Sequence, residues 1–263
     1  MKKKLLWFGV GSIYLLMVLS CAVPPMPSSS PGGSQGNVSP TPQQERPGLA
    51  TTWGETRDSR VQETSFTRAN YANPTATAAI YYNDEEGIRA MTGSSGQRTS
   101  AELLPVPSNA YNLVSFGIHD EAGRTLEGLT MDGKRYVLGE AGSRYSIVVR
   151  NNTGNRLEAV LSVDGLDVLD GKAAAVTKNG YVISPYSTLT VDGFRQSMDT
   201  VAAFRFGSVQ ESYANQKYGD SRNVGVIGLA IFHEMGTNPF ATHDEVQRRH
   251  SADPFPNRFA TPP

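Results

Sequence analysis

The decapeptide SVDGLDVLDG, residues 162–171, places three aspartates at a spacing of three, with a glycine after Asp164 and after Asp170. Carboxylates in this pattern could bind a calcium ion, act as an acid–base pair, or form tight turns. A calcium loop of the EF-hand type needs oxygen ligands at alternate positions. Counted from Asp164, those positions hold Leu166 and Val168, which cannot bind a metal. The EF-hand interpretation therefore fails.

Turn formation explains the same residues better. Asp-Gly is the favoured pair of a two-residue type I′ hairpin turn, because both central residues need a positive φ. We therefore expect tight turns at three Asp-Gly pairs, residues 164–165, 170–171 and 192–193. Asp167 differs, because alternation along a strand would point it away from its apolar neighbours, toward solvent or a nearby loop. A calcium or sugar site built from Asp167 and such a loop remains the alternative.

Two segments match catalytic motifs only in part. GSSG at residues 93–96 lacks the spacing of the G-x-S-x-G elbow. His233 starts HEMGT like a metalloprotease helix, but Thr237 stands where the second histidine is required. The enzymatic hypothesis that remains is a glycan hydrolase using Asp167 and a second carboxylate, a pair that such enzymes hold about 5–10 Å apart. We expect neither a metal nor a cofactor.

The most informative segment is GSVQESYANQKYGDSRN, residues 207–223, which separates two strand-like runs. Connections of this length without secondary structure are uncommon and are often functional. Its candidate binding residues are Tyr213, Tyr218, Asp220, Arg222 and Asn223. Tyrosine and arginine suit binding surfaces, so the segment is either a partner-binding loop or a surface loop whose tyrosines pack back on the domain. Arg195 is a further candidate, whose guanidinium could pair with an acidic group of a neighbouring turn.

Short β-prone runs, separated by turn signals, must position these residues. About nine such runs lie between residues 108 and 235, and no helical period of 3.6 is sustained there. VGVIGLAIF, residues 224–232, is apolar on both faces and predicts a central strand that is covered on each side. Short strands at this spacing predict an all-β fold, a single β-sandwich of the jelly-roll or immunoglobulin kind.

The flanks have a different composition. Residues 21–74, which begin rich in Pro, Ser and Gly, predict a disordered tether, because such a segment cannot bury enough apolar surface to offset its ordering entropy. Residues 75–107 predict an extra strand or a short helix. Residues 236–263 predict a disordered tail, with a short helix over 242–250 as the alternative, because Thr242 and Glu245 have the capping-box spacing.

The N-terminus MKKKLLWFGVGSIYLLMVLSC combines three lysines with an apolar run too short to cross a membrane comfortably, which predicts a secretory signal over residues 1–20. Its last four residues, VLSC, resemble the lipobox of bacterial lipoproteins. That resemblance implies that Cys21 is lipidated and becomes the mature N-terminus. Ala22 follows the cysteine, which by similarity to enterobacterial sorting favours the outer membrane. Residues 135–234 also resemble a group of uncharacterised exported bacterial proteins, for which no activity is implied.

These observations say more about the location of the protein than about its function. The net charge is −1 and no basic patch is present, which argues against a nucleic-acid partner. We expect a lipid-anchored protein of the cell envelope, at the periplasmic face of the outer membrane or the cell surface. Its sandwich would be a non-catalytic binding or structural module with a protein or glycan partner, and the glycan hydrolase is the alternative.

The lipid anchor can be tested at Cys21, the only cysteine of the chain. Without the thiol no thioether-linked lipid can form, so a Cys21→Ser variant should be released from membranes or remain unprocessed. Radiolabelled palmitate should enter the wild-type protein and not the variant. Equal labelling of both proteins would contradict lipidation at this residue.

Overall fold

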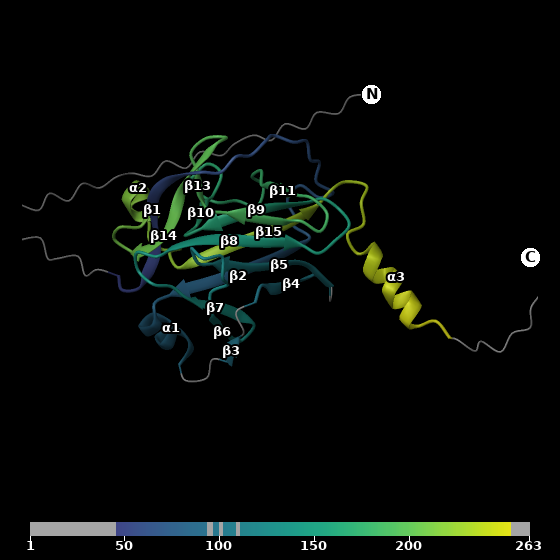
Figure 1. The fold of residues 1–263 in the computed structure, drawn as a ribbon, viewed down its shortest axis with the longest axis horizontal. Coiled ribbons are helices and arrows are strands. Elements are labelled where there is room, and N and C mark those ends of the chain that lie inside the picture. The colour runs from purple at the N-terminus through teal and green to yellow at the C-terminus, as the bar shows by residue number, and fades with distance from the viewer. Residues whose placement is uncertain (1–45, 94–96, 100–101, 109–110, 254–263) are drawn as a thin grey trace, which may run out of the picture. The chain divides into compact units, whose positions relative to one another are not determined.

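The computed structural model describes residues 46–93, 97–99, 102–108 and 111–253. Two β-sheets pack face to face within these residues (Figure 1), so the predicted all-β sandwich is confirmed. Cys21 and the predicted signal segment lie outside the described residues.

One layer of the sandwich, the first sheet, is antiparallel throughout. Its described strands are β1 (Leu49–Asp58), β4 (Leu104–Ser108), β5 (Tyr111–His119), β8 (Arg144–Asn151), β12 (Thr188–Val191), β13 (Gly193–Arg195) and β14 (Thr200–Ser208). They are ordered β1-β14-β8-β5-β4, while β12 pairs with β8 and β13 with β14. Its outer face is turned toward the viewer in Figure 1.

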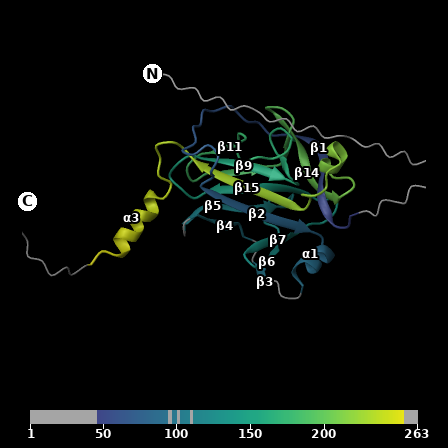
Figure 2. The ribbon, with the colours of Figure 1, turned by 180° about the vertical axis from the view of Figure 1, so that it is seen from behind.

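The opposite layer, the second sheet, is seen from its own side in Figure 2. Its described strands are β2 (Ala76–Asn83), β3 (Gln97–Thr99), β6 (Gly128–Met131), β7 (Lys134–Leu138), β9 (Leu157–Val163), β10 (Leu166–Asp167), β11 (Tyr181–Ile183) and β15 (Val226–His233). The order is β10-β9-β15-β2-β7-β6-β3, with β11 beside β9 and a parallel pairing of β2 with β7. β15 lies between β9 and β2, which confirms the prediction of a central strand over 224–232.

Three helices accompany the sheets: α1 (Glu85–Thr92), α2 (Tyr213–Tyr218) and α3 (Ala241–His250). α1 begins at Asp84, whose carboxylate accepts a hydrogen bond from the Gly87 amide at 2.7 Å. The helix buries Ile88 and Thr92 against the sandwich. The segment 75–107 therefore contains both of the predicted possibilities, a strand in β2 and a short helix in α1.

The sandwich begins well before the predicted boundary at residue 108. β1 lies inside the predicted tether 21–74 and pairs with β14 from Leu49 to Asp58. The tether prediction is therefore wrong for this stretch. LATTWGETRD contains few apolar residues, because an edge strand buries only part of itself: Leu49, Ala50 and Thr51 are buried and most of the rest is exposed.

The predicted tail also contains an ordered element. Residues 241–250 form α3, so disorder is wrong for this part of the segment 236–263 and the alternative, a short helix, is confirmed. The helix begins at Phe240 rather than at Thr242. Glu245 forms ion pairs with Arg248 and Arg249, at positions three and four residues on.

The three Asp-Gly pairs for which a turn was predicted behave differently from one another. Asp164 and Gly165 both have positive φ, 53° and 78°, as the predicted hairpin turn requires. At the second pair only Gly171 has a positive φ. The third prediction is wrong: Gly193 belongs to β13, and a Cβ there would lie 1.9 Å from the Ala202 carbonyl oxygen. Glycine is required at this position by close backbone approach and not by a turn.

A buried ion pair holds the segment between β1 and β2. The Arg68 guanidinium lies against the Glu158 carboxylate, with Nε to Oε2 at 2.7 Å and Nη2 to Oε1 at 3.0 Å. Its charge also sits over the Phe232 ring, 3.9 Å from the centroid. Arg68 further donates to the backbone carbonyl oxygens of Tyr71 and Val176. These bonds hold the segment between β1 and β2 against the outer face of the second sheet.

A buried carboxylate links the two sheets. Asp164, in the turn after β9, has 4 % of its surface exposed. Its Oδ1 accepts hydrogen bonds from the Tyr82 hydroxyl at 2.6 Å and the Gly225 amide at 2.9 Å. Its Oδ2 accepts one from the Thr51 amide at 2.7 Å. Because Thr51 belongs to β1, this single side chain fastens the edge of the first sheet to the second.

The hydroxyl groups around Asp164 form a chain with a defined direction. Thr51 Oγ1 lies 2.7 Å from the Tyr82 hydroxyl and 2.6 Å from the Tyr145 hydroxyl. An ionised carboxylate can only accept, so Tyr82 donates to Asp164. Thr51 then donates to Tyr82, and Tyr145 donates to Thr51. Every hydroxyl proton of this buried network thus has an acceptor.

Burial raises the pKa of Asp164 from 3.8 to about 6, against the lowering effect of the hydrogen bonds that it accepts. The folded chain therefore binds this proton more tightly than the unfolded chain does. The resulting stabilisation is fully present below about pH 4 and is lost as the pH rises through about 6. A shift of roughly two pKa units corresponds to about 3 kcal/mol.

An Asp164→Asn variant isolates this effect, since asparagine tolerates the positive φ but does not titrate. Asparagine has an oxygen at only one of the two positions that Oδ1 and Oδ2 occupy in Asp164, so a buried donor loses its acceptor. This loss should lower the free energy of unfolding by about 1–3 kcal/mol. The stability gap between wild type and variant should be wider at pH 4 than at pH 7, by up to about 3 kcal/mol. Urea unfolding at both pH values measures it, and other titrating groups cancel in the difference. An equal gap would show that Asp164 does not titrate in this range.

Candidate functional site

The segment 207–223, which the sequence predicts to lack secondary structure, contains a short helix. β14 continues to Ser208, and α2 occupies the middle of the segment. The Ser212 hydroxyl accepts a hydrogen bond from the Asn215 amide, and Gly219 ends the helix in the left-handed conformation. A serine before and a glycine after a short run is a signal that could have predicted α2 from the sequence.

A continuous run of aromatic rings leads from the core to α2. It passes from Tyr82 through Phe206, Tyr145, Phe204 and Phe194 to Tyr213 and Trp53, with successive centroids 4.4–5.3 Å apart. Tyr213 is partly buried and packs on the core. Of the two interpretations of the tyrosines, packing back on the domain is therefore correct for Tyr213.

Trp53 ends this run at the surface and was missed by the sequence reasoning. It lies on β1, the strand that runs beside α2 in Figure 1. Its ring stacks parallel to Phe194 and contacts Tyr213, yet 43 % of the residue is exposed. A tryptophan in the polar stretch 51–58 was the available signal. The polar composition around it predicts a tether, and a tether gives a tryptophan no structural role.

Tyr218 completes an exposed aromatic surface on α2. It is 45 % exposed, and its hydroxyl donates to the Gly171 carbonyl oxygen at 2.8 Å. The Lys217 ammonium sits between two rings, 4.9 Å from the Tyr213 centroid and 5.5 Å from that of Tyr218. We call Trp53, Tyr213, Lys217 and Tyr218 together the α2 surface.

Asp167 has a structural role and does not face solvent as expected. It is 2 % exposed, and its Oδ1 accepts from the Leu169 and Asp170 amides at 2.9 and 3.2 Å. Burial raises the pKa of this carboxyl. β10 is only two residues long, so the carboxylate folds back to cap the turn that follows. The adjacent Asp170 is paired with the Lys178 ammonium at 2.8 Å.

Arg195 also serves the fold. Its guanidinium donates to the Tyr181 hydroxyl at 3.0 Å, and to the backbone oxygen and hydroxyl of Ser59 at 2.7 and 3.0 Å. The acidic partner that the sequence suggested is replaced by these neutral acceptors. Arg195 thereby links the end of β1 to β11, and its guanidinium donors are used in these structural hydrogen bonds.

The remaining candidates follow α2 in the chain. Asp220 and Arg222 form an exposed ion pair with Oδ2 to Nη2 at 2.7 Å, which lowers the pKa of Asp220 to about 2. Asn223 lies against Gly165, where an added Cβ would come within 2.8 Å of it. The hairpin turn of Asp164 and the segment 207–223 are thus in contact.

His233 and its neighbours do not form a metal centre. Its Nδ1 lies 2.8 Å from the hydroxyl of Thr75, the residue before β2. No group of three or more histidine, cysteine or acidic residues in the described part of the chain is arranged to hold a metal ion. The described helices include none that is long and apolar enough to span a membrane.

Comparisons of the chain with protein-family models, curated proteins and solved structures find no match.

The packing of α2 predicts a contrast between two candidate residues. Tyr213→Ala removes a ring from the aromatic run and should cost about 2 kcal/mol or more of unfolding free energy. Arg222→Ala, whose side chain is 85 % exposed, should change stability by no more than about 0.5 kcal/mol. Denaturant unfolding of the two variants provides the comparison. Equal effects would mean that Tyr213 does not belong to the core.

Proposed function

We propose that this protein is a cell-envelope lipoprotein, anchored through Cys21, whose sandwich is a non-catalytic module that binds a partner protein through the α2 surface. The observation that carries the proposal is Trp53, a large ring that is nearly half exposed and yet held by two other rings. Exposed tryptophan costs solubility, and its fixed position is what a binding surface requires.

The chemistry of the α2 surface suits a protein partner. Tryptophan, tyrosine and arginine are the residue types that contribute most to binding energy at protein interfaces. Trp53 and Tyr218 supply apolar area, while Lys217 supplies charge. Rings already held by neighbours lose little conformational freedom on binding. A glycan, which also stacks on such rings, is the other partner that this surface could accept.

The geometry gives less support to the glycan hydrolase. Asp167, on which that alternative depends, is buried and accepts two backbone hydrogen bonds. The neighbouring carboxylate, Asp170, is held by the Lys178 ammonium.

The anchor would keep the binding module close to the membrane. The sandwich begins at Leu49, so the proposed tether runs only from Cys21 to residue 48. A flexible chain of that length spans roughly 30 Å. A partner would therefore be found in the membrane or within a short distance of it, and shortening the tether should change function gradually.

Cross-linking in intact cells tests the α2 surface. A triple variant Trp53→Ala/Lys217→Ala/Tyr218→Ala should lose at least ten times the yield of specific cross-linked species, because these are the exposed side chains of the α2 surface. Tyr213 is left unchanged, since it contributes to the core. Tyr186→Ala is the matched control, because Tyr186 is 63 % exposed and lies outside the α2 surface.

Circular dichroism confirms that both variants are folded. Equal cross-linking by the triple variant and wild type would overturn the proposal. Loss of binding to purified cell-wall glycan, with protein cross-links unchanged, would assign the surface to a glycan instead.

A further inference from the structure

A polar cleft opens on the outer face of the first sheet, apart from the α2 surface. Its volume is about 230 Å³, and its walls come from β1, β5, β8, β12 and β14 and from the turn after β5. Drug-sized ligands need roughly 300–1,000 Å³, so this cleft suits a smaller molecule. The polar residues that line it include Arg57, His119, Ser146, Thr190 and Asp192.

The floor of the cleft is a row of polar side chains across adjacent strands. His119 on β5 stands opposite Ser146 on β8 in the antiparallel register. On the other side, the Ser146 hydroxyl donates to Asp192 Oδ1 at 2.8 Å. Asp192 comes directly after β12, whose last residue pairs with Ile147. The hydroxyl is therefore committed to the carboxylate, and Asp192 Oδ2 remains available to a ligand.

A β-bulge brings Arg57 to the same face. Trp53 pairs with Phe204, whose ring points into the sandwich, but three residues later Thr56 pairs with Ala202, only two residues further along β14. The extra residue in β1 reverses which side chains face outward. Arg57 is consequently opposite Val201 and lines the cleft, although it has the same parity along the chain as Trp53.

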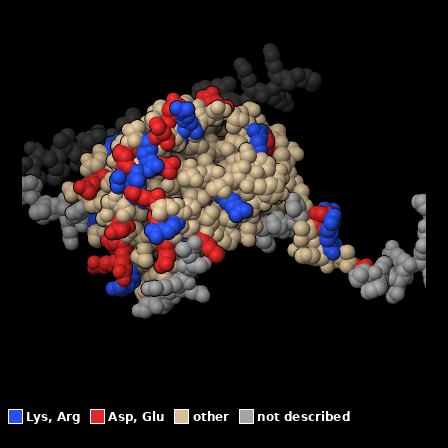
Figure 3. Space-filling model, in the orientation of Figure 1, with Lys and Arg blue, Asp and Glu red and all other residues tan. Residues whose placement is uncertain are grey.

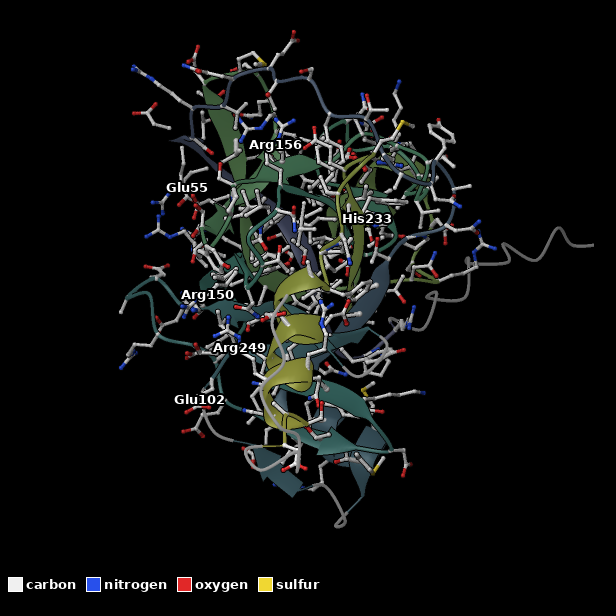
Figure 4. The ribbon with its side chains drawn as sticks, turned by 90° about the vertical axis from the view of Figure 1, so that its right-hand side faces the viewer. Glu55, Glu102, Arg150, Arg156, His233 and Arg249 are labelled. Carbon is white, nitrogen blue, oxygen red and sulfur yellow. The ribbon has the colours of Figure 1, made fainter. Side chains whose placement is uncertain are left out.

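The other charges around the cleft are already neutralised. Glu121 and Glu55 both hold the Arg144 guanidinium at 2.8–2.9 Å, and Glu55 also holds Arg205 at 2.8 Å. These bonds lower the pKa values of Glu55 and Glu121 to about 2, so the network stays ionised. Figure 3 shows charges of both signs interspersed over this side of the sheet, and the edge-on view of Figure 4 places Glu55 there.

Asp120, at the rim, is likewise bound to Arg124 at 2.7 Å. Among the described residues, this leaves one cation and one anion of the cleft without an oppositely charged partner within 4.0 Å: Arg57 and Asp192. They face one cleft without pairing with each other. A ligand that carries both charges would satisfy both residues at once.

From this geometry we infer that the cleft binds a small zwitterion of the α-amino acid type. The Arg57 guanidinium takes the carboxylate, for which its planar donor fork is suited. Asp192 Oδ2 accepts from the ammonium. His119 and Thr190 offer hydrogen-bonding groups to the remainder of a polar ligand. This site differs from the α2 surface, so its failure would leave the proposed function unaffected.

Calorimetric titration of the full chain with L-alanine tests the inference. Two analogues each remove one charge: N-acetyl-L-alanine lacks the ammonium and L-alaninamide lacks the carboxylate. We expect alanine to bind and both analogues to bind at least tenfold more weakly. Binding of acetate or N-acetyl-L-alanine as tightly as alanine would reveal a simple anion site and overturn the proposal. So would binding of glucose with alanine inert.

Two variants assign the binding to the cleft. Arg57→Gln should weaken alanine binding at least tenfold, and Asp192→Asn should do the same while keeping an acceptor for Ser146. Arg150→Gln is the matched control, since Arg150 is exposed on β8 on the same side of the molecule (Figure 4) but does not line the cleft. No alanine binding by the folded wild type would overturn the proposal. Undiminished binding by both cleft variants would overturn it too.

Discussion

The buried Asp164 carboxylate is the constraint on which the rest of this structure depends. A charge inside a sandwich is costly unless several donors satisfy it. Here the amides of Thr51 and Gly225 and the hydroxyl of Tyr82 do so. Because those donors come from β1, from β2 and from the residue before β15, the carboxylate sets where three segments meet. The layers cannot shift relative to one another without leaving a charge unsatisfied.

β1 depends on this network more than any other strand does. It lies at the edge of its sheet and has few apolar residues to bury. The Thr51 amide and hydroxyl compensate, because both join the buried network. Two residues of β1 then reach the surface on different faces, Trp53 at the α2 surface and Arg57 in the polar cleft. Both proposed binding sites therefore rest on a strand that is held by polar contacts.

The bulge in β1 explains how one strand serves two faces. Before it, side chains such as Trp53 continue the aromatic run that starts in the core. After it, Arg57 joins the outer face of the first sheet. That region is bordered by a network of ion pairs in which every charge has a partner: Glu55, Arg144, Glu121 and Arg205. Specificity in the cleft would then come from a small number of unpaired groups.

Local patterns in the sequence predicted the strands that alternate or are uniformly apolar. RYSIVVRN is β8, residue for residue, and VGVIGLAIF contains the central strand β15 except for its last residue, His233. The turn at Asp164 was also visible, because an Asp-Gly pair acts over a few residues. The helix over 242–250 was expected from a capping-box spacing that the structure does not use, since α3 begins at Phe240 without a side-chain cap. Cys21 and its implied lipid depend on the sequence alone.

Tertiary structure decided the features that arise between distant segments. LATTWGETRD becomes a strand only through pairing with β14, about 150 residues later in the chain. Asp167 becomes buried because its two-residue strand turns back at once, which alternation could not predict. The row of His119, Ser146 and Asp192 exists because β5, β8 and β12 are neighbours. A pattern of neighbouring residues carries no information about such register, since it is fixed by the packing of the two sheets.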